Sequence, residues 1–326
     1  MVDSQHMIDP LGVLASTRRV VERAQSVRID QPAIDHLAVR IASHELTTAG
    51  WDSDLHWSDG TDATANFILV LDALNFCFWG EPRWIVNYRG NRYNGYAALA
   101  AALTRALNDG IPLTDAAFLA KIDEVQLGAI LAGEQTIPLL PERVDNLREV
   151  GRVLQGRYSG QFSALIRTAN GSAVALVQRV VDEFSSFRDV ALYPGAEVFF
   201  YKRAQILASD LHGAFNGAGL GAFHDLDQLT AFADYKVPQV LRALGVLHYE
   251  PKLSRLIEER VELRAGSAYE IEIRAATVWA VEELRRSLVN HGLNLPAYQL
   301  DWTLWQLGQD LPASSSPYHR TRTIYY

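Results

Sequence analysis

The stretch from Asp225 to Gly245, DLDQLTAFADYKVPQVLRALG, constrains the fold of this chain more than any other. Its pattern predicts two short helices that meet at a tight corner. Asp225 is a candidate N-cap with Gln228 three residues later, and Pro238 suits the first turn of the second helix. Asp234 then stands near the start of that second helix, where backbone N–H groups favour an ionised carboxylate or a bound anion. The spacing leaves two interpretations open: the carboxylate caps the helix, or it serves a function.

The composition is that of a globular protein and argues against several classes. With 326 residues, of which 48% are hydrophobic, the chain can bury a core as one domain or as two closely packed lobes. The net charge of −8 argues against a protein that coats nucleic acid. The single cysteine, Cys77, excludes an internal disulfide, lies in an apolar run that favours simple packing, and fits a reducing, cytoplasmic location.

The first six residues, MVDSQH, differ in character from the rest of the chain, and we expect them to be a leader, with Met7 as the native start. Residues 7–326 are then the folded unit. The sequence contains no apolar run long enough to span a bilayer, so we expect no membrane partner.

Helical periodicity dominates the chain, so the expected fold class is mainly α. A small β-hairpin is predicted where two alternating segments, 84–88 and 91–94, flank Arg89 and Gly90. The predicted helices cover Leu11–Ala24, Pro32–Leu46, Ala65–Trp79, Gly95–Asn108, Thr114–Ile122, Glu124–Ala132, Pro141–Leu154, Ala164–Phe184, Ala196–Phe215, a long helix from the capping box at Ser267 to about Asn290, and Ala297–Leu307.

The segment Ala65–Trp79 is apolar almost all round, which predicts a fully buried helix. Asp72 and Asn75 interrupt it three residues apart and share a face. Burying either side chain unpaired costs about 1–3 kcal/mol, so both must be hydrogen-bonded. They bond either to a neighbouring backbone or as supports behind a binding pocket.

Several motifs then occur in a fixed order along nearly the whole chain. The segment Phe232–Arg242 has the form FxDYxVPQxLR, and the other motifs are LDALNFCFW (71–79), GYAAL (95–99), FYKRAQ (200–205), EIRA (272–275), DWTLW (301–305) and HRTRTIYY (319–326). Each motif alone is weak, but the ordered set resembles the queuosine salvage family, the queuosine 5′-phosphate N-glycosylases/hydrolases. The resemblance implies a helical fold similar to helix-hairpin-helix DNA glycosylases.

It also implies an activity: hydrolysis of the N-glycosidic bond of queuosine 5′-monophosphate to release queuine for salvage into tRNA modification, with queuosine left open as a second substrate. The residues present suit such chemistry. The sequence contains no zinc-binding pattern and no GxSxG nucleophile motif, so carboxylates and general acids must supply the chemistry. A carboxylate suits this reaction, because it stabilises the positive charge of an oxocarbenium-like transition state. We expect a small-molecule substrate, no metal or cofactor, and no stable nucleic-acid complex.

We assign the roles as hypotheses that rest on this resemblance. Asp234 is the catalytic carboxylate, and Asp301 reads the edge of the base or acts as the partner acid. The remaining assignments are Phe232 stacking on the base, His44 and Gln306 contacting queuine, Lys202, Tyr235 and Lys236 meeting the 5′-phosphate, and Asp72 and Asn75 supporting the pocket from outside. Two other functions stay open: a non-catalytic protein that binds queuine or its nucleotide, and a glycosylase that acts on polymeric nucleic acid.

Overall fold

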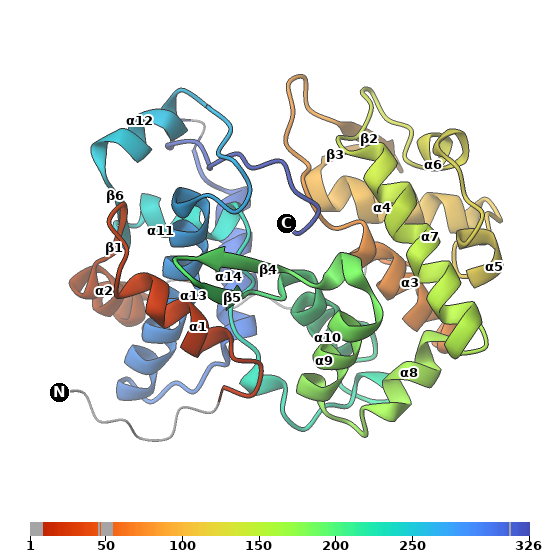
Figure 1. Cartoon of the computed structure of the whole chain (residues 1–326), viewed down its shortest axis with the longest axis horizontal. Helices are drawn as coiled ribbons and strands as arrows, with labels where there is room; N and C mark the ends of the chain where they lie inside the picture. Colours follow the sequence, from red (N-terminus) through yellow and green to blue (C-terminus); the bar gives the residue numbers. More distant parts are fainter. Residues whose placement is uncertain (1–8, 45, 47–54, 313) are drawn as a thin grey trace. The chain divides into compact units, whose positions relative to one another are not determined.

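The computed structural model describes residues 9–44, 46, 55–312 and 314–326 (Figure 1). The protein is mainly helical, and its described strands form three antiparallel pairs. The fold class expected from the sequence is therefore confirmed at this level. The chain divides into two compact units, each assembled from separated stretches: unit 1 from Met1–Gly50, Val190–Lys202 and Asp225–Arg322, and unit 2 from Trp51–Asp189, Arg203–His224 and Thr323–Tyr326. The expected leader, residues 1–6, lies outside the described residues.

Unit 1 is built around its longest helix. Ser267 accepts the backbone N–H of Glu270 and caps this helix, as the sequence predicts, and α1, α2, α11 and α14 pack against it. The elements of unit 1 are α1 (Val13–Val21), β1 (Val27–Ile29), α2 (Gln31–Ala42), β4 (Val190–Tyr193), β5 (Ala196–Phe199), the 3₁₀ turn η3 (Leu226–Gln228), α11 (Lys236–Ala243), β6 (Leu247–Tyr249), α12 (Pro251–Glu258), α13 (Ala268–Asn290) and α14 (Ala297–Gln309).

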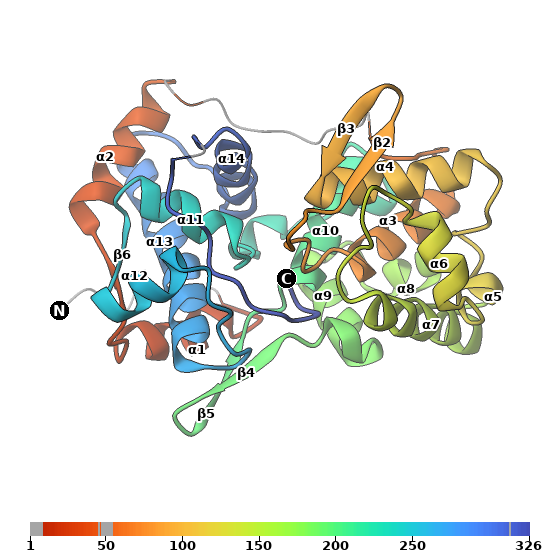
Figure 2. The same ribbon diagram turned by 90° about the horizontal axis from the view of Figure 1, so that it is seen from above.

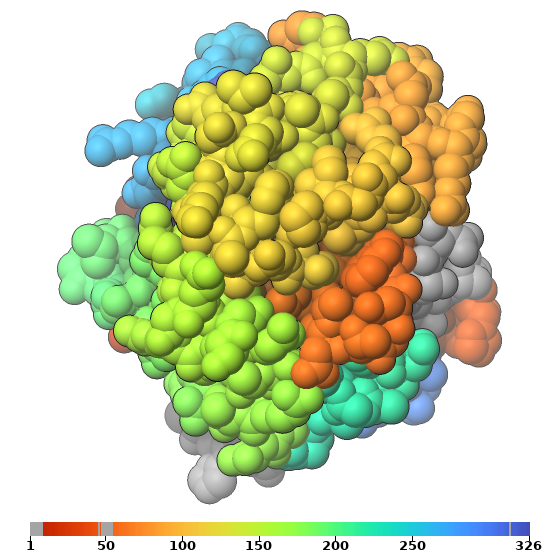
Figure 3. Space-filling view, turned by 90° about the vertical axis from the view of Figure 1, so that its right-hand side faces the viewer, coloured from red at the N-terminus to blue at the C-terminus, as the bar shows by residue number. Residues whose placement is uncertain are grey.

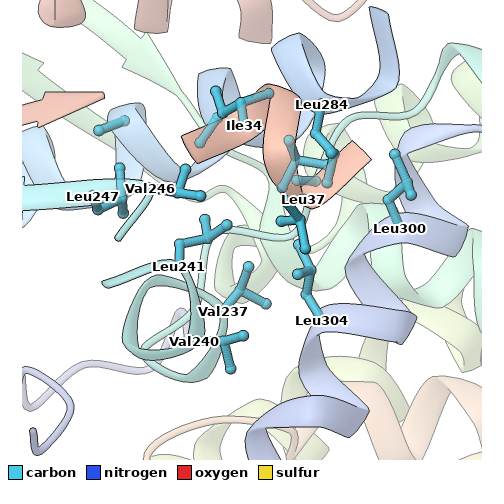
Figure 4. Packing of buried hydrophobic residues seen from close by; sticks show 14 of the residues in the cluster. Ile34, Leu37, Val237, Val240, Leu241, Val246, Leu247, Leu284, Leu300 and Leu304 are labelled. Carbon is cyan, nitrogen blue, oxygen red and sulfur yellow. The ribbon is translucent and has the colours of Figure 1, made fainter. Parts of the chain in front are cut away.

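The core of unit 1 lies where α2, α11, α13 and α14 meet (Figure 4). Leu37 from α2, Leu241 from α11, Leu284 from α13 and Leu304 from α14 are all buried there. Removing such aliphatic side chains from water is the main favourable term for folding. This packing fixes the start of α11 and the inner face of α14, and both carry predicted site residues.

Unit 2 surrounds a helix that is buried on almost every side. Its elements are α3 (Asp62–Ala73), β2 (Ile85–Tyr88), β3 (Asn91–Asn94), α4 (Gly95–Asn108), α5 (Ala116–Leu119), α6 (Glu124–Ile130), α7 (Leu140–Arg157), α8 (Phe162–Thr168), α9 (Ala173–Glu183), η1 (Ser185–Phe187), α10 (Lys202–Ala214, from Arg203 on) and η2 (Gly219–Gly221). α3 packs against α4, α7 and α8, which confirms the buried helix. It ends at Ala73, however, and not at Trp79. The segments from α5 to α8 form the yellow to green surface in Figure 3.

The predicted hairpin is confirmed: β2 and β3 pair antiparallel with Tyr88 opposite Asn91, beside α4 (Figure 2). A second hairpin overturns the predicted helix start at Ala196. There, β5 pairs with β4 and Tyr193 faces Ala196, because Pro194 and Gly195 form the turn and Gly195 has a φ of +81°. Helix α10 begins only at Lys202.

Two further predictions about helices are wrong. Ala164–Phe184 is not one helix, because Asn170 and Gly171 adopt positive φ and separate α8 from α9. The first helix of the predicted corner after Asp225 is only the 3₁₀ turn η3, and residues 229–235 form neither helix nor strand. None of the described helices is long and apolar enough to cross a membrane.

Candidate active site

The irregular segment 229–235 leads directly into α11, and long-range contacts hold its backbone. The N–H of Phe232 donates to Asp301 Oδ2 at 2.9 Å. The carbonyl of Ala233 accepts from Arg274 Nε at 3.0 Å. Buried backbone groups need hydrogen-bond partners, and here side chains from α13 and α14 supply what a helix would otherwise provide. The segment therefore has a defined course that fixes the position of Asp234.

Asp234 follows directly and is 8% exposed. Its Oδ1 accepts the N–H groups of Lys236 and Val237, the first two residues of α11, at 2.7 and 2.8 Å. The capping interpretation is thus confirmed. Neither bond uses Oδ2, so capping leaves half of the carboxylate for another role. Burial raises the pKa of Asp234, against the charge of Lys202 and the two backbone N–H groups, which favour its ionised form.

Asp301 projects from α14 and is 4% exposed. Burial, reinforced by the negative charge of Asp234, holds its pKa well above the ordinary value, and the N–H of Phe232 and the charge of Lys202 only partly offset this. Two neighbouring carboxylates in a buried site do not both ionise readily. At neutral pH, Asp301 therefore keeps a proton more readily than Asp234 does.

Lys202 supplies the positive charge that acts on both acids. It is 5% exposed, and its charge lowers the pKa of both Asp234 and Asp301. It follows Tyr201, whose φ of 48° turns the chain between β5 and α10. A buried ammonium beside two carboxylates departs from the usual behaviour of lysine, which extends its charged end into water.

Lys236 and Tyr235 lie at the start of α11, next to Asp234. The Lys236 ammonium donates to the carbonyl of Gly308 at 2.8 Å and to Gln239 Oε1 at 3.2 Å. It thereby joins the start of α11 to the last turn of α14. The ring of Tyr235 packs against Tyr318, with centroids 4.9 Å apart. These contacts give both side chains a structural role at the edge of the acid pair.

The structure brings Asp234, Asp301, Lys202 and the backbone of Phe232 together in unit 1. The ring of Phe232 is only 2% exposed. His44, just beyond α2 with a φ of 60°, and Gln306, on α14, are both exposed, in contrast to the buried acids. Their roles and the stacking role of Phe232 stay predictions.

Asp72 and Asn75 lie in unit 2 and bond to each other, Asn75 Nδ2 donating to Asp72 Oδ1 at 3.4 Å, so they share a face as predicted. The negative charge of Asp72 also acts on the buried Arg203, whose pKa burial lowers to about 10. The expected support of a pocket by this pair stays a prediction.

Sequence reasoning assigned no role to Arg274, although it lies in the EIRA motif. The residue is 2% exposed on α13, ion-paired with Glu270 at 3.4 Å, and its guanidinium lies 3.9 Å from the ring centroid of Phe200. Next to it, burial and the charge of Arg274 lower the pKa of His319 to about 3. The signal in the sequence was the Glu270–Arg274 spacing of one helical turn inside a helix that is otherwise buried.

The described residues contain no group of His, Cys, Asp and Glu side chains arranged to hold a metal ion.

Comparison with known proteins identifies related sequences along the whole chain. The family model described as queuosine salvage protein matches residues 55–326. A protein of Sphaerobacter thermophilus named queuosine 5′-phosphate N-glycosylase/hydrolase is 60% identical over 318 residues, which cover 98% of each chain. Proteins with the same name from Dictyostelium discoideum and Mus musculus are 38% and 35% identical, over 98% and 97% of this chain and 100% and 99% of their own lengths.

Proposed function

The chain belongs to the queuosine salvage protein family, and on that premise we propose that it hydrolyses the N-glycosidic bond of queuosine 5′-monophosphate and releases queuine. The observation that carries the proposal is a pair of buried acids, Asp234 and Asp301, which hydrogen bonds to the backbone of residues 232–237 hold and on which the charge of Lys202 acts. Glycosidic bond cleavage needs one ionised carboxylate and one acid, and this site contains two carboxylates whose environments separate their pKa values.

The two acids divide the work in this proposal. Asp234, whose ionised form is favoured by the charge of Lys202 and by the N–H groups at the start of α11, stabilises the positive charge that develops on the ribose and orients the attacking water. Asp301, whose pKa burial and the charge of Asp234 raise well above its ordinary value, donates a hydrogen bond to the departing base. The backbone N–H of Phe232 fixes the orientation of Asp301 through Oδ2, which leaves Oδ1 to face the base.

The leaving group explains why a carboxylic acid is needed. Queuine is a 7-deazaguanine and has carbon where guanine has N7, so the usual site of protonation is missing. Assistance must reach the base through its O6/N1 or N3 edge. A neutral carboxylic acid both donates and accepts, and thus suits an edge that carries adjacent donors and acceptors.

The substrate contacts are part of the same proposal. Lys202, Tyr235 and Lys236 contact the 5′-phosphate in this proposal, and Lys202 is also the buried positive charge that acts on both acids. Phe232 stacks on the base, and His44 and Gln306 contact it at the exposed side. The fold is further proposed to be similar to helix-hairpin-helix DNA glycosylases, the location cytoplasmic, and the substrate a free nucleotide rather than a stable nucleic-acid complex.

The test is direct. Purified protein is incubated with queuosine 5′-monophosphate and with queuosine, and free queuine is followed by chromatography. Release from the monophosphate that is lost in Asp234→Asn supports the reaction and its carboxylate. Asp227→Asn, at an exposed position of η3, is the matched control and keeps wild-type turnover.

Other outcomes favour other functions. Tight binding of queuine without release from either compound indicates a binding protein. Release only from intact tRNA or DNA, together with a gel shift that weakens at high salt, indicates a polymer-directed glycosylase.

A further inference from the structure

Arg274 contacts two of the stretches of unit 1 that carry site residues. Its Nε donates to the carbonyl of Ala233, the residue before Asp234. Its guanidinium lies over the ring of Phe200, two residues before Lys202, with 3.9 Å from Cζ to the ring centroid. A single buried side chain thus contacts the approach to the carboxylate and the approach to the lysine.

The guanidinium is itself held in place. Glu270, one helical turn earlier on α13, pairs with Arg274 Nη1 at 3.4 Å and is 3% exposed. The other oxygen of Glu270 accepts the N–H of Gly266 at 3.1 Å, just before the helix begins. A planar group fixed by an ion pair, an aromatic ring and a carbonyl has little rotational freedom, so it can transmit the position of α13 to the Asp234 segment.

We propose that Arg274 is a positioning residue that holds Asp234 and Lys202 in their mutual geometry through Ala233 and Phe200. The inference rests on the proposed function. Of the residues Phe232, Ala233 and Asp234, each is bonded to a different group: Phe232 to Asp301, Ala233 to Arg274, and Asp234 to the start of α11. Loss of the middle bond frees the carbonyl next to the catalytic carboxylate while the two outer bonds remain.

Lysine cannot replace this arginine. A lysine keeps the charge but is a point donor on a flexible stem. It cannot reach Ala233 and Glu270 together while lying flat on the Phe200 ring. Arg274→Lys therefore tests geometry separately from charge.

The experiment measures kcat and KM for queuosine 5′-monophosphate, per folded protein, in wild type and three variants. Arg274→Lys should lower kcat about tenfold to a hundredfold, because misplacement of a reacting group acts on the transition state, and KM should rise by a smaller factor, because Lys202 also shifts. Glu270→Gln should lower kcat by a smaller factor in the same pattern. Arg242→Lys is the matched control: it also pairs with a glutamate, Glu258, and lies over a ring, Tyr249, in unit 1.

The outcomes separate cleanly. Unchanged kcat in Arg274→Lys, a rise in KM alone, or an equal loss in Arg242→Lys overturns the positioning role. If Arg274→Lys does not fold, Glu270→Gln decides by the same criterion. Wild-type protein that releases no queuine removes the proposed function and the positioning role with it. Wild-type release together with an unaffected Arg274→Lys removes the positioning role alone.

Discussion

Asp301 accepts the backbone N–H of Phe232 at 2.9 Å across 69 positions of sequence. This bond ties α14 to the segment that carries Asp234, so the two acids are held by one connected set of contacts. The charge of Asp234 in turn raises the pKa of Asp301. The position of the two acids and the protonation of Asp301 therefore depend on each other. Single substitutions at Asp234, Asp301 or Lys202 can test the two effects separately.

Asp234→Asn should remove catalysis and leave the fold intact. An asparagine oxygen can still accept the N–H groups of Lys236 and Val237, so the free energy of unfolding should change by less than about 1 kcal/mol. The lost charge should lower kcat about 10²–10³-fold. Turnover assays and urea unfolding on the same preparation measure both quantities.

Asp234→Ala is the matched comparison, because alanine loses the charge and the cap together. It should be about 1 kcal/mol less stable than Asp234→Asn with a similarly low kcat. Full turnover in Asp234→Asn would show that this carboxylate only caps the helix and has no catalytic role.

The pH dependence of kcat/KM should be bell-shaped. The pKa of Asp234 is raised, so activity is lost as the pH falls and that group takes up a proton. The pKa of Asp301 lies well above the ordinary value, so activity is lost as the pH rises through it and the acid is consumed. Asp301→Asn should lower kcat about 10²–10⁴-fold and abolish the alkaline limb, while the acid limb stays.

Asp310→Asn, at the exposed end of α14, provides the control and should keep both limbs. An alkaline limb that persists in Asp301→Asn would assign the general acid to another group.

Lys202→Met should move the acid limb to higher pH. The ammonium lowers the pKa of Asp234, so its removal lets that carboxylate bind a proton more tightly. If Lys202 also contacts the 5′-phosphate, the preference for the monophosphate over the nucleoside, measured as a ratio of kcat/KM, should fall about 10–100-fold. Lys252→Met on the exposed face of α12 should change neither quantity. If the acid limb of the pH profile shifts but the preference for the monophosphate stays, the phosphate contact lies on another residue.

His319 should make the protein less stable in acid. Burial and Arg274 lower its pKa to about 3, whereas the unfolded chain titrates near the ordinary value of about 6.5. Between these values only the unfolded state binds the proton, so the free energy of unfolding should fall by about 1.4 kcal/mol for each unit of pH below 6.5. His319→Gln cannot take up that proton and should flatten the slope by this amount.

Urea unfolding at pH 7.5, 6 and 5 measures the slope. His224→Gln, at an exposed position in unit 2, should leave the slope as in wild type. Identical slopes for wild type and His319→Gln would show that the buried imidazole is charged in the folded protein.

Local signals in the sequence sufficed where the structure uses local contacts. Ser267 and Glu270 marked the start of α13, and the capping role of Asp234 followed from its place before Pro238. The prediction of a helix after Asp225 failed because the backbone there bonds to Asp301 and Arg274. Both residues lie far away in sequence, so no local pattern indicates these bonds.

Two further shortcomings have different causes. Helical spacing of apolar residues after Ala196 concealed a strand, because the turn at Pro194 and Gly195 and the pairing with β4 outweighed that pattern. Motif resemblance assigned roles to Asp234, Asp301 and Lys202, which the structure buries in unit 1. It gave no role to Arg274, whose contacts reach 41 positions back to Ala233 and become visible only in three dimensions.

The bonds from the side chains of Asp301 and Arg274 to the backbone of Phe232 and Ala233 also affect the order in which the protein folds. Their partners lie 69 and 41 positions away, so these bonds close long loops and form only after α13 and α14 have docked. A refolding intermediate with most of its helix content would still lack an ordered Asp234. If Asp234 acts as proposed, enzymatic activity would then recover later than the circular dichroism signal, and activity would report completion of the tertiary structure.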